Sequence, residues 1–285
     1  MPVRRPRLAA VHLLLALMTV LATALAGPGA AQPGIAPAGS VAAPDAPARA
    51  WLIADMDSGR ILAGKDPYGS YAPASTIKVL LAMVVLDQLH PNAVVRAPAA
   101  HDRVECSCAG VVPGQVYTTR QLLEGLLMVS GNDAANLLGD MLGGYRAAVT
   151  KMNIKAQRLG ARGTRASSPS GLDGPGWESV TTAHDLAVLF RSALAYPLIA
   201  QIMRQTSAMF PGRSDYREIT NQNELLHRYP GNLGGKTGYT NLAGDTFVTA
   251  AQRDGRRLVV TQLKADGDLY GPAIALLDWG FSQPR

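Results

Sequence analysis

The placement of the expected strands constrains the fold of this chain more than any other feature of its sequence. Strand-forming stretches occur at both ends of the chain that is expected to fold, and helix-forming stretches fill the middle. Alternating apolar residues, separated by turn residues, predict strands over residues 51–55, 60–63, 232–239, 246–252 and 257–263. Apolar residues at helical spacing predict helices over residues 75–89, 119–129, 133–142, 146–159 and 181–195, with a last helix from about residue 272.

This order of elements predicts an α/β protein of the α+β type. Strands from both chain ends can pair in one antiparallel sheet flanked by helices, with an all-helical lobe inserted between them. Asp254-Gly255 is a typical hairpin turn between the last two strands. The helix from residue 75 is apolar nearly all round, which predicts that it lies buried at the centre of the molecule.

The first 48 residues differ in composition from the rest. Three arginines at positions 4, 5 and 7 precede an apolar run that ends in Ala24-Leu25-Ala26, which is typical of an export signal over residues 1–26. Residues 27–48 are rich in Ala, Pro and Gly and predict a flexible lead, so the catalytic domain is expected over residues 49–285. The domain is therefore expected outside the cytoplasm, periplasmic or extracellular, and tethered to the membrane if the signal is not cleaved.

Charge and cysteine content exclude some classes of site. The net charge is +6, and the N-terminal arginines supply three of these charges, so the remainder is too mildly basic to indicate a nucleic-acid partner. No feature indicates a protein partner. Cys106 and Cys108 could form a disulfide in an oxidising compartment, although the ring across one residue is strained. They have no histidine cluster nearby and do not indicate a metal site.

The first candidate catalytic motif is Ser75-Thr76-Ile77-Lys78, at the start of the predicted central helix. A serine needs a base to become a nucleophile, and a residue three positions further along a helix lies within its reach. Lys78 can be that base if burial lowers its pKa. The motif alone is weak, because a capping serine followed by a surface lysine has the same spacing.

Two further motifs follow in the chain. Ser130-Gly131-Asn132 lies between two predicted helices, where Ser130 could pass a proton to a leaving amine and Asn132 could bind a substrate amide. Lys236-Thr237-Gly238 lies on a predicted strand, where Lys236 and Thr237 could bind a terminal carboxylate and Gly238 would leave room for a peptide beside the strand. Taken alone, the second motif could be only a turn and the third only a strand edge softened by glycine. The occurrence of all three motifs in this order is what indicates a catalytic site.

The chain resembles the low-molecular-mass penicillin-binding proteins, specifically the serine D-alanyl-D-alanine carboxypeptidases of the actinobacterial type. The resemblance covers about residues 50–281. It is carried by the three motifs with the residues around them, in Pro73–Lys78, Leu127–Ala135 and Gly234–Thr240, and by the further segment Pro169–Asp173. It implies a penicillin-binding/β-lactamase-like fold, association with the cell wall, and peptidoglycan stem peptides ending in D-Ala-D-Ala as substrates. It also implies that β-lactams are covalent inhibitors and that no metal or organic cofactor is needed.

The main alternative is a class A-like β-lactamase. That family has Glu-x-x-Leu-Asn between the second and third motifs, and no glutamate between residues 133 and 235 stands in that pattern. The corresponding segment, residues 168–174, has no glutamate at all. A transpeptidase shares the acylation chemistry and remains open. A non-catalytic wall-binding domain would not need all three motifs.

The mechanism that the resemblance implies has two steps. Lys78 takes the proton of Ser75, Ser75 attacks the penultimate D-Ala carbonyl, and Ser130 passes a proton to the leaving D-Ala. The backbone amides of Ser75 and Tyr239 would hold the oxyanion. Water then hydrolyses the acyl-enzyme.

Overall fold

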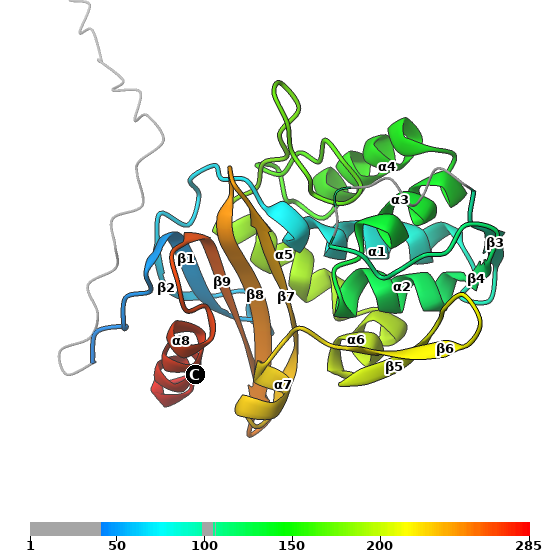
Figure 1. Ribbon diagram of the computed structural model, residues 1–285. Coiled ribbons are helices and arrows are strands. Elements are labelled where there is room, and N and C mark those ends of the chain that lie inside the picture. The colour runs from blue at the N-terminus through cyan, green and yellow to red at the C-terminus, as the bar shows by residue number, and fades with distance from the viewer. Residues whose placement is uncertain (1–40, 99–104, 106) are drawn as a thin grey trace, which may run out of the picture. The chain divides into compact units, whose positions relative to one another are not determined.

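The sheet predicted from both chain ends is present in the computed structural model (Figure 1). The structure describes residues 41–98, 105 and 107–285. Its main sheet has five strands in the order β2-β1-β9-β8-β7, and all neighbouring strands are antiparallel. The strands are β1 (Ala48–Asp55), β2 (Ile61–Lys65), β7 (Asn232–Thr240), β8 (Gly244–Arg253) and β9 (Arg256–Ala265). Pairing of β1 with β9 joins the two ends of the chain, as expected for this α+β fold.

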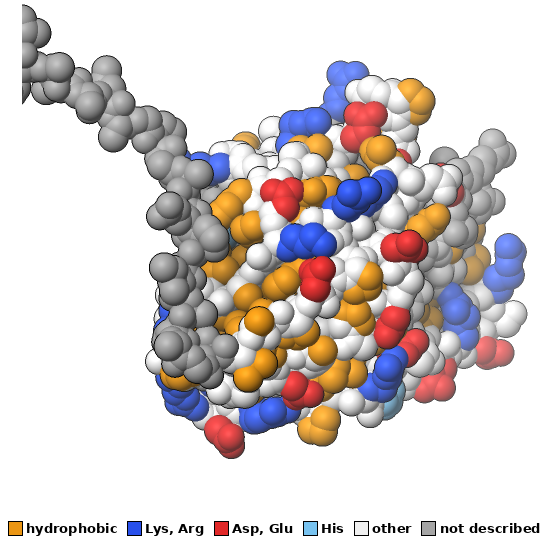
Figure 2. Space-filling view, turned by 90° about the vertical axis from the view of Figure 1, so that its left-hand side faces the viewer, with side chains coloured by type: hydrophobic (Ala, Val, Ile, Leu, Met, Phe, Trp, Pro, Cys, Tyr) orange, Lys and Arg blue, Asp and Glu red, His pale blue; other side chains and the backbone are white. Residues whose placement is uncertain are grey.

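Helices cover both faces of the sheet. On one face lies α8, the last helix, and on the other α5 packs on β1, β8 and β9 (Figure 1). The central strands are therefore buried on both sides, which explains why β1, β8 and β9 read as nearly continuous apolar runs. Over the side that carries β1, β2 and α8, acidic and basic side chains are interspersed among hydrophobic ones (Figure 2), in keeping with the mild net charge.

The helical lobe is built around α1, which packs on α2, α4 and α5. Residues from Lys78 to Val85 of α1 are all buried, as its apolar sequence predicts. A 3-10 turn, η1, precedes α1 and carries Ser75. The lobe and its neighbours comprise η1 (Ala74–Ile77), α1 (Lys78–Gln88), α2 (Thr119–Met128), α3 (Asn132–Met141), α4 (Tyr145–Arg158), α5 (Ala183–Ala193), α6 (Pro197–Arg204), α7 (Leu225–Arg228) and α8 (Tyr270–Ser282).

Several short elements were not predicted. Two small sheets pair β3 (Val94–Arg96) with β4 (Val116–Thr118) and β5 (Ser207–Pro211) with β6 (Tyr216–Thr220). Their strands are too short to show a clear alternation of apolar and polar residues. The helix α6 begins at Pro197, because proline is favoured at the first position of a helix as well as beyond the end of one.

The N-terminal segments are described only in part. The predicted signal at residues 1–26 and the lead up to residue 40 lie outside the described residues. Residues 41–48, which the sequence assigns to the lead, belong to the folded unit: Ala46 and Ala48 are buried, and Trp51 Nε1 donates to Asp45 Oδ1 at 2.8 Å. In the part of the chain that the structure describes, no single helix is long and apolar enough to cross a bilayer. Only α5 and α6 taken together have the length and apolar composition of a membrane span, and these two helices are bent by 104° relative to each other.

A buried ion pair ties the sheet to the last helix. Arg256 Nε donates to Asp55 Oδ2 at 3.0 Å, and Arg256 Nη1 donates to the carbonyls of Gly280 and Gln283. Burial alone would raise the pKa of Asp55. Hydrogen bonds from Ser58 and Arg256 outweigh that effect and lower the pKa to about 2.

Removing one partner of this pair should strongly destabilise the protein. We expect Asp55→Ala to lower the free energy of unfolding by about 3–5 kcal/mol, because it leaves the Arg256 guanidinium buried without a counter-charge. The control is Asp57→Ala, which breaks the exposed pair with Arg257 and should lower it by less than about 1 kcal/mol. Urea unfolding of both variants checks the prediction, and equal losses would contradict it.

Candidate active site

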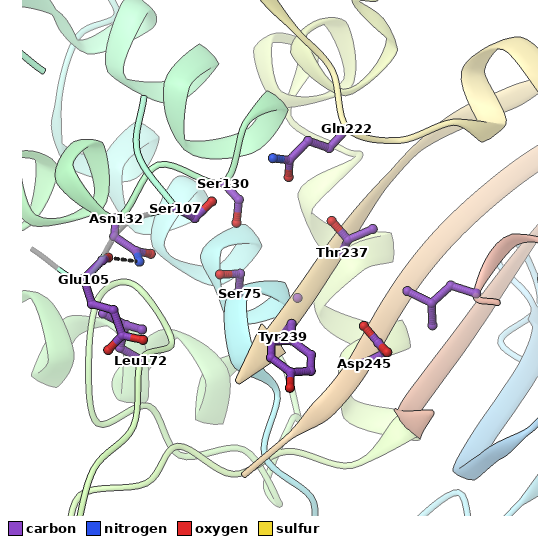
Figure 3. Close-up of a pocket in the computed structure, with 12 residues that line it drawn as sticks. Ser75, Glu105, Ser107, Ser130, Asn132, Leu172, Gln222, Thr237, Tyr239 and Asp245 are labelled. Carbon is purple, nitrogen blue, oxygen red and sulfur yellow. Dashed lines mark hydrogen bonds between the residues drawn. The ribbon is translucent and has the colours of Figure 1, made fainter. Parts of the chain in front are cut away.

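A groove of about 450 Å³ lies between strand β7 and the helical lobe (Figure 3). Six of the predicted site residues line this groove: Ser75, Ser130, Asn132, Thr237, Gly238 and Tyr239. The two predicted lysines, Lys78 and Lys236, do not line the groove, because their side chains are buried in the protein next to it. The structure thus brings all eight predicted catalytic and substrate-binding residues to one place.

Close backbone approaches fix the position of Ser75. A Cβ at Gly238 would lie 2.7 Å from Ser75 N, and a Cβ at Gly171 would lie 2.0 Å from the Ala74 carbonyl oxygen. Only glycine allows strand β7 and the loop around Gly171 to come this near. Thr246 Oγ1 donates to the Pro73 carbonyl at 2.9 Å and holds the start of η1 against β8. The Ser75 amide is among the first amides of its helix, which have no acceptor within the helix.

Lys78 Nζ is the centre of the hydrogen-bond network. It lies 2.6 Å from Ser75 Oγ, 2.7 Å from Asn132 Oδ1 and 2.7 Å from the Ser170 carbonyl oxygen. The side chain is fully buried. Three segments that are far apart in the sequence therefore meet at one amine.

The surroundings of Lys78 favour its neutral form. Burial lowers the pKa well below its ordinary value of 10.5, the nearby charge of Lys236 lowers it further, and Asp133 opposes these effects. A neutral amine has two hydrogens and one lone pair. Because Asn132 Oδ1 and the Ser170 carbonyl can only accept, they take the two hydrogens. The lone pair is left for the hydroxyl hydrogen of Ser75.

The orientation of Asn132 is fixed by its other bond. Asn132 Nδ2 donates to the main-chain carbonyl of Glu105 at 2.7 Å, which leaves Oδ1 facing Lys78. Ser130 has a positive φ of 62°, a strained conformation for a residue with a side chain, and lies in the tight connection between α2 and α3.

Gly131 explains the form of the second motif. A Cβ there would lie 2.7 Å from Ala109 Cβ and 2.8 Å from Ala109 N. An aspartate at this position, as in the Ser-Asp-Asn of many β-lactamases, would have to displace the loop that contains Ala109.

Asp133 holds that loop in place. Its carboxylate accepts hydrogen bonds from the amides of Ala109, Gly110 and Val111, at 2.7–2.8 Å. A carboxylate early in a helix is also typical of a helix cap, and the Ala134 amide donates to Asp133 Oδ1 at 2.8 Å. The contact across more than 20 residues has no sequence signal.

Lys236 and Thr237 lie on an open strand edge. Strand β7 is the last strand of the sheet order, so one of its edges is free to pair with an extended peptide. Lys236 Nζ donates to the Thr237 carbonyl at 2.7 Å, and burial lowers the pKa of Lys236 to about 7. A substrate carboxylate beside it would favour the charged form.

The loop of residues 168–174 forms the side of the site next to Lys78, where Leu172 lines the groove. The Ser170 carbonyl, and not a glutamate, faces Lys78. Asp173 Oδ2 accepts from Thr240 Oγ1 at 2.6 Å, which fastens the loop to the end of β7. The segment thus has no glutamate to activate water beside Ser75, and its one carboxylate, that of Asp173, is bonded to Thr240 instead.

Several groove residues were not predicted: Glu105, Ser107, Leu172, Gln222, Asp245 and Leu269. They come from separate loops and strand ends, and none belongs to the three catalytic motifs, although Leu172 lies in the segment Pro169–Asp173 that contributes to the resemblance. Of the two cysteines, Cys106 lies outside the described residues, so its disulfide with Cys108 stays a prediction.

Comparison with known proteins places this geometry in a family. The D-alanyl-D-alanine carboxypeptidase family profile matches residues 38–267. The chain is 56% identical over 257 residues to D-alanyl-D-alanine carboxypeptidase DacB2 of Mycobacterium tuberculosis, and the match covers 88% of each chain. It is 26% identical to D-alanyl-D-alanine carboxypeptidase DacF of Bacillus subtilis, of which it spans 62%.

Solved structures agree with the sequence matches. A D-alanyl-D-alanine carboxypeptidase from Mycobacterium tuberculosis superposes with a TM-score of 0.85 at 55% identity, covering 88% of this chain and 97% of that one. A mutant of a Streptomyces DD-transpeptidase superposes with a TM-score of 0.79 at 28% identity, covering 84% and 100%. With this fold, this groove and these matches, the chain belongs to the D-alanyl-D-alanine carboxypeptidase family.

Proposed function

We propose that this enzyme removes the terminal D-Ala from peptidoglycan stem peptides ending in D-Ala-D-Ala, through an acyl-enzyme on Ser75. The observation that carries the proposal is the buried Lys78 amine, 2.6 Å from Ser75 Oγ, beside an open strand edge with its own lysine. This pairing of a base with a carboxylate site fits a peptidase that acts at a chain terminus.

Substrate binding uses the free edge of β7. The terminal carboxylate lies by Thr237 and Lys236, and the peptide extends along the strand past Tyr239, antiparallel to it. Asn132 is within reach of the substrate amide on the opposite wall of the groove. The penultimate carbonyl then lies over Ser75.

Acylation begins when Lys78 takes the hydroxyl proton of Ser75. The oxygen of Ser75 attacks the carbonyl carbon, and the oxyanion receives hydrogen bonds from the amides of Ser75 and Tyr239. Loss of one such donor typically raises the barrier by about 3–4 kcal/mol. The C–N bond breaks as the hydroxyl of Ser130 gives its proton to the leaving D-Ala amine, and the proton on Lys78 restores that hydroxyl. Water then hydrolyses the ester and frees Ser75.

A β-lactam follows the same first step but forms a long-lived adduct. Its ring opens on Ser75, and the loop of residues 168–174 has no glutamate to activate water for the second step, while the carboxylate of its Asp173 is bonded to Thr240. This absence disfavours the alternative of a class A-like β-lactamase, which would require rapid hydrolysis of the same adduct.

We also propose that the enzyme acts outside the cytoplasm, at the cell wall. The support is the basic and apolar composition of residues 1–26, which is typical of an export signal. The polymer that carries the proposed substrate lies in the same compartment.

Replacing Ser75 tests the proposed function directly. We expect the wild-type enzyme to release D-Ala from a diacylated Lys-D-Ala-D-Ala peptide, and Ser75→Ala to release none above background, because among the described residues Ser75 supplies the hydroxyl that is bonded to Lys78. A D-amino-acid oxidase assay measures release. Ser70→Ala, an exposed serine five positions earlier, is the matched control and should keep full activity. Release that survives Ser75→Ala would refute the assignment.

The pH dependence of acylation tests the role of Lys78. Because the pKa of Lys78 is lowered and its free amine is the base, acylation by a β-lactam should rise with pH and reach its plateau well below pH 10.5. Lys78→Arg should slow acylation by at least about 1,000-fold, since arginine stays protonated. Stopped-flow measurement over pH 5–11 checks this. A rate that still climbs between pH 9 and 11 would contradict a depressed pKa.

A further inference from the structure

Glu105 is a charged residue of the groove to which no part of the mechanism above assigns a role. Its side chain lines the groove with Leu172 and Tyr239. Its main-chain carbonyl accepts from Asn132 Nδ2 at 2.7 Å, so a residue of the second motif fixes its backbone. Among the described residues, no lysine or arginine pairs with its carboxylate.

The direction of the bound peptide brings its upstream part to Glu105. The terminal carboxylate belongs at Thr237, and Gln222 lies at the same end of the groove (Figure 3). Glu105 and Leu172 lie on the side of Ser75 that faces away from Thr237 (Figure 3). An extended chain advances by about 3.3 Å per residue. The residue just before the two D-Ala residues is therefore the first whose side chain extends past Ser75 toward Glu105.

The groove is electrostatically polarised along this direction. Lys236 supplies positive charge at the carboxylate end, and Glu105 supplies negative charge at the other. Asp245, the other acidic residue of the groove, lies on β8 opposite Tyr239 in the strand pairing. Burial and the neighbouring Asp266 raise the pKa of Asp245. A substrate with a carboxylate at one end and a cation at the other is complementary to this arrangement.

We propose that Glu105 is a specificity residue that selects peptides whose residue immediately before D-Ala-D-Ala carries a side-chain amine. The inference rests on the proposed function, because it assumes the peptide orientation given there. The aliphatic stem of a lysine-like side chain would lie along Leu172, and its ammonium group would reach the Glu105 carboxylate. The preference concerns binding and orientation, so the chemistry at Ser75 is unchanged.

The test compares two peptides that differ only in one charge. Nα-acetyl-Lys-D-Ala-D-Ala has a free ε-amine, and its Nε-acetylated form does not. For the wild-type enzyme we expect kcat/KM to favour the free amine by about twofold to fivefold, the range of an exposed ion pair. Salt should weaken the preference. Glu105→Gln should abolish it, and Glu105→Lys should reverse it for an Nε-succinylated peptide.

Matched controls separate this role from others. Glu218→Gln makes the same chemical change at an exposed site on β6 and should keep the preference. Acylation of Glu105→Gln by benzylpenicillin, and the lifetime of that adduct, should equal those of the wild type, because the inhibitor has no amine to bind Glu105. A longer-lived adduct in Glu105→Gln would mean that this carboxylate activates water, and would overturn the proposed role.

The outcomes also distinguish this inference from the function on which it rests. Release of D-Ala from neither peptide by the wild type would overturn the proposed function and the inference with it. Equal release from both peptides would leave the function standing and refute the inference. A preference that survives Glu105→Gln but disappears in Asp245→Asn would assign the selection to the other carboxylate, and would also refute it.

Discussion

The structure depends on one buried amine. Lys78 has lost its contact with water, and its hydrogen bonds go to two obligate acceptors and one hydroxyl. Burial favours the neutral form, no acidic side chain among the described residues is bonded to the amine, and its lone pair faces Ser75. The same bonds hold together η1, the start of α3 and the loop of residues 168–174. Catalytic activation and the assembly of the groove are therefore consequences of a single arrangement.

The fold supplies what this arrangement needs. The sheet brings strands from both chain ends together, so that β7 stands at its edge next to the first turn of the central helix. Gly171 and Gly238 allow the loop and the strand to come within contact of that turn. Asp133 fixes the loop of residues 109–111 on the side of the helical lobe, by accepting hydrogen bonds from three of its amides. Each wall of the groove is thus fixed by a contact that a larger side chain or a missing carboxylate would break.

Sequence alone predicted the sheet and the major helices, and it singled out the eight candidate site residues that the structure brings together, because each has a local signal. Buried strands and helices show periodicity, and the three motifs have fixed spacing. It did not predict the clamp at Asp133, the Ser170 carbonyl beside Lys78 or the place of Glu105. These depend on contacts between segments far apart in the chain, which no local pattern encodes. The folded stretch at residues 41–48 was missed for a related reason, since its small residues gain burial only once the sheet and α8 are in place.

We infer that Lys78 is a neutral amine in the resting enzyme. The most direct test is an NMR titration of the ε-carbon signal in protein labelled with [ε-13C]lysine, with the signals of Lys78 and Lys236 assigned from arginine variants. We expect the Lys78 signal to titrate well below 10.5 and to stay in its neutral position throughout the range of activity. A signal that titrates at or above 10.5 would show a charged lysine beside Ser75, and would contradict its role as the base.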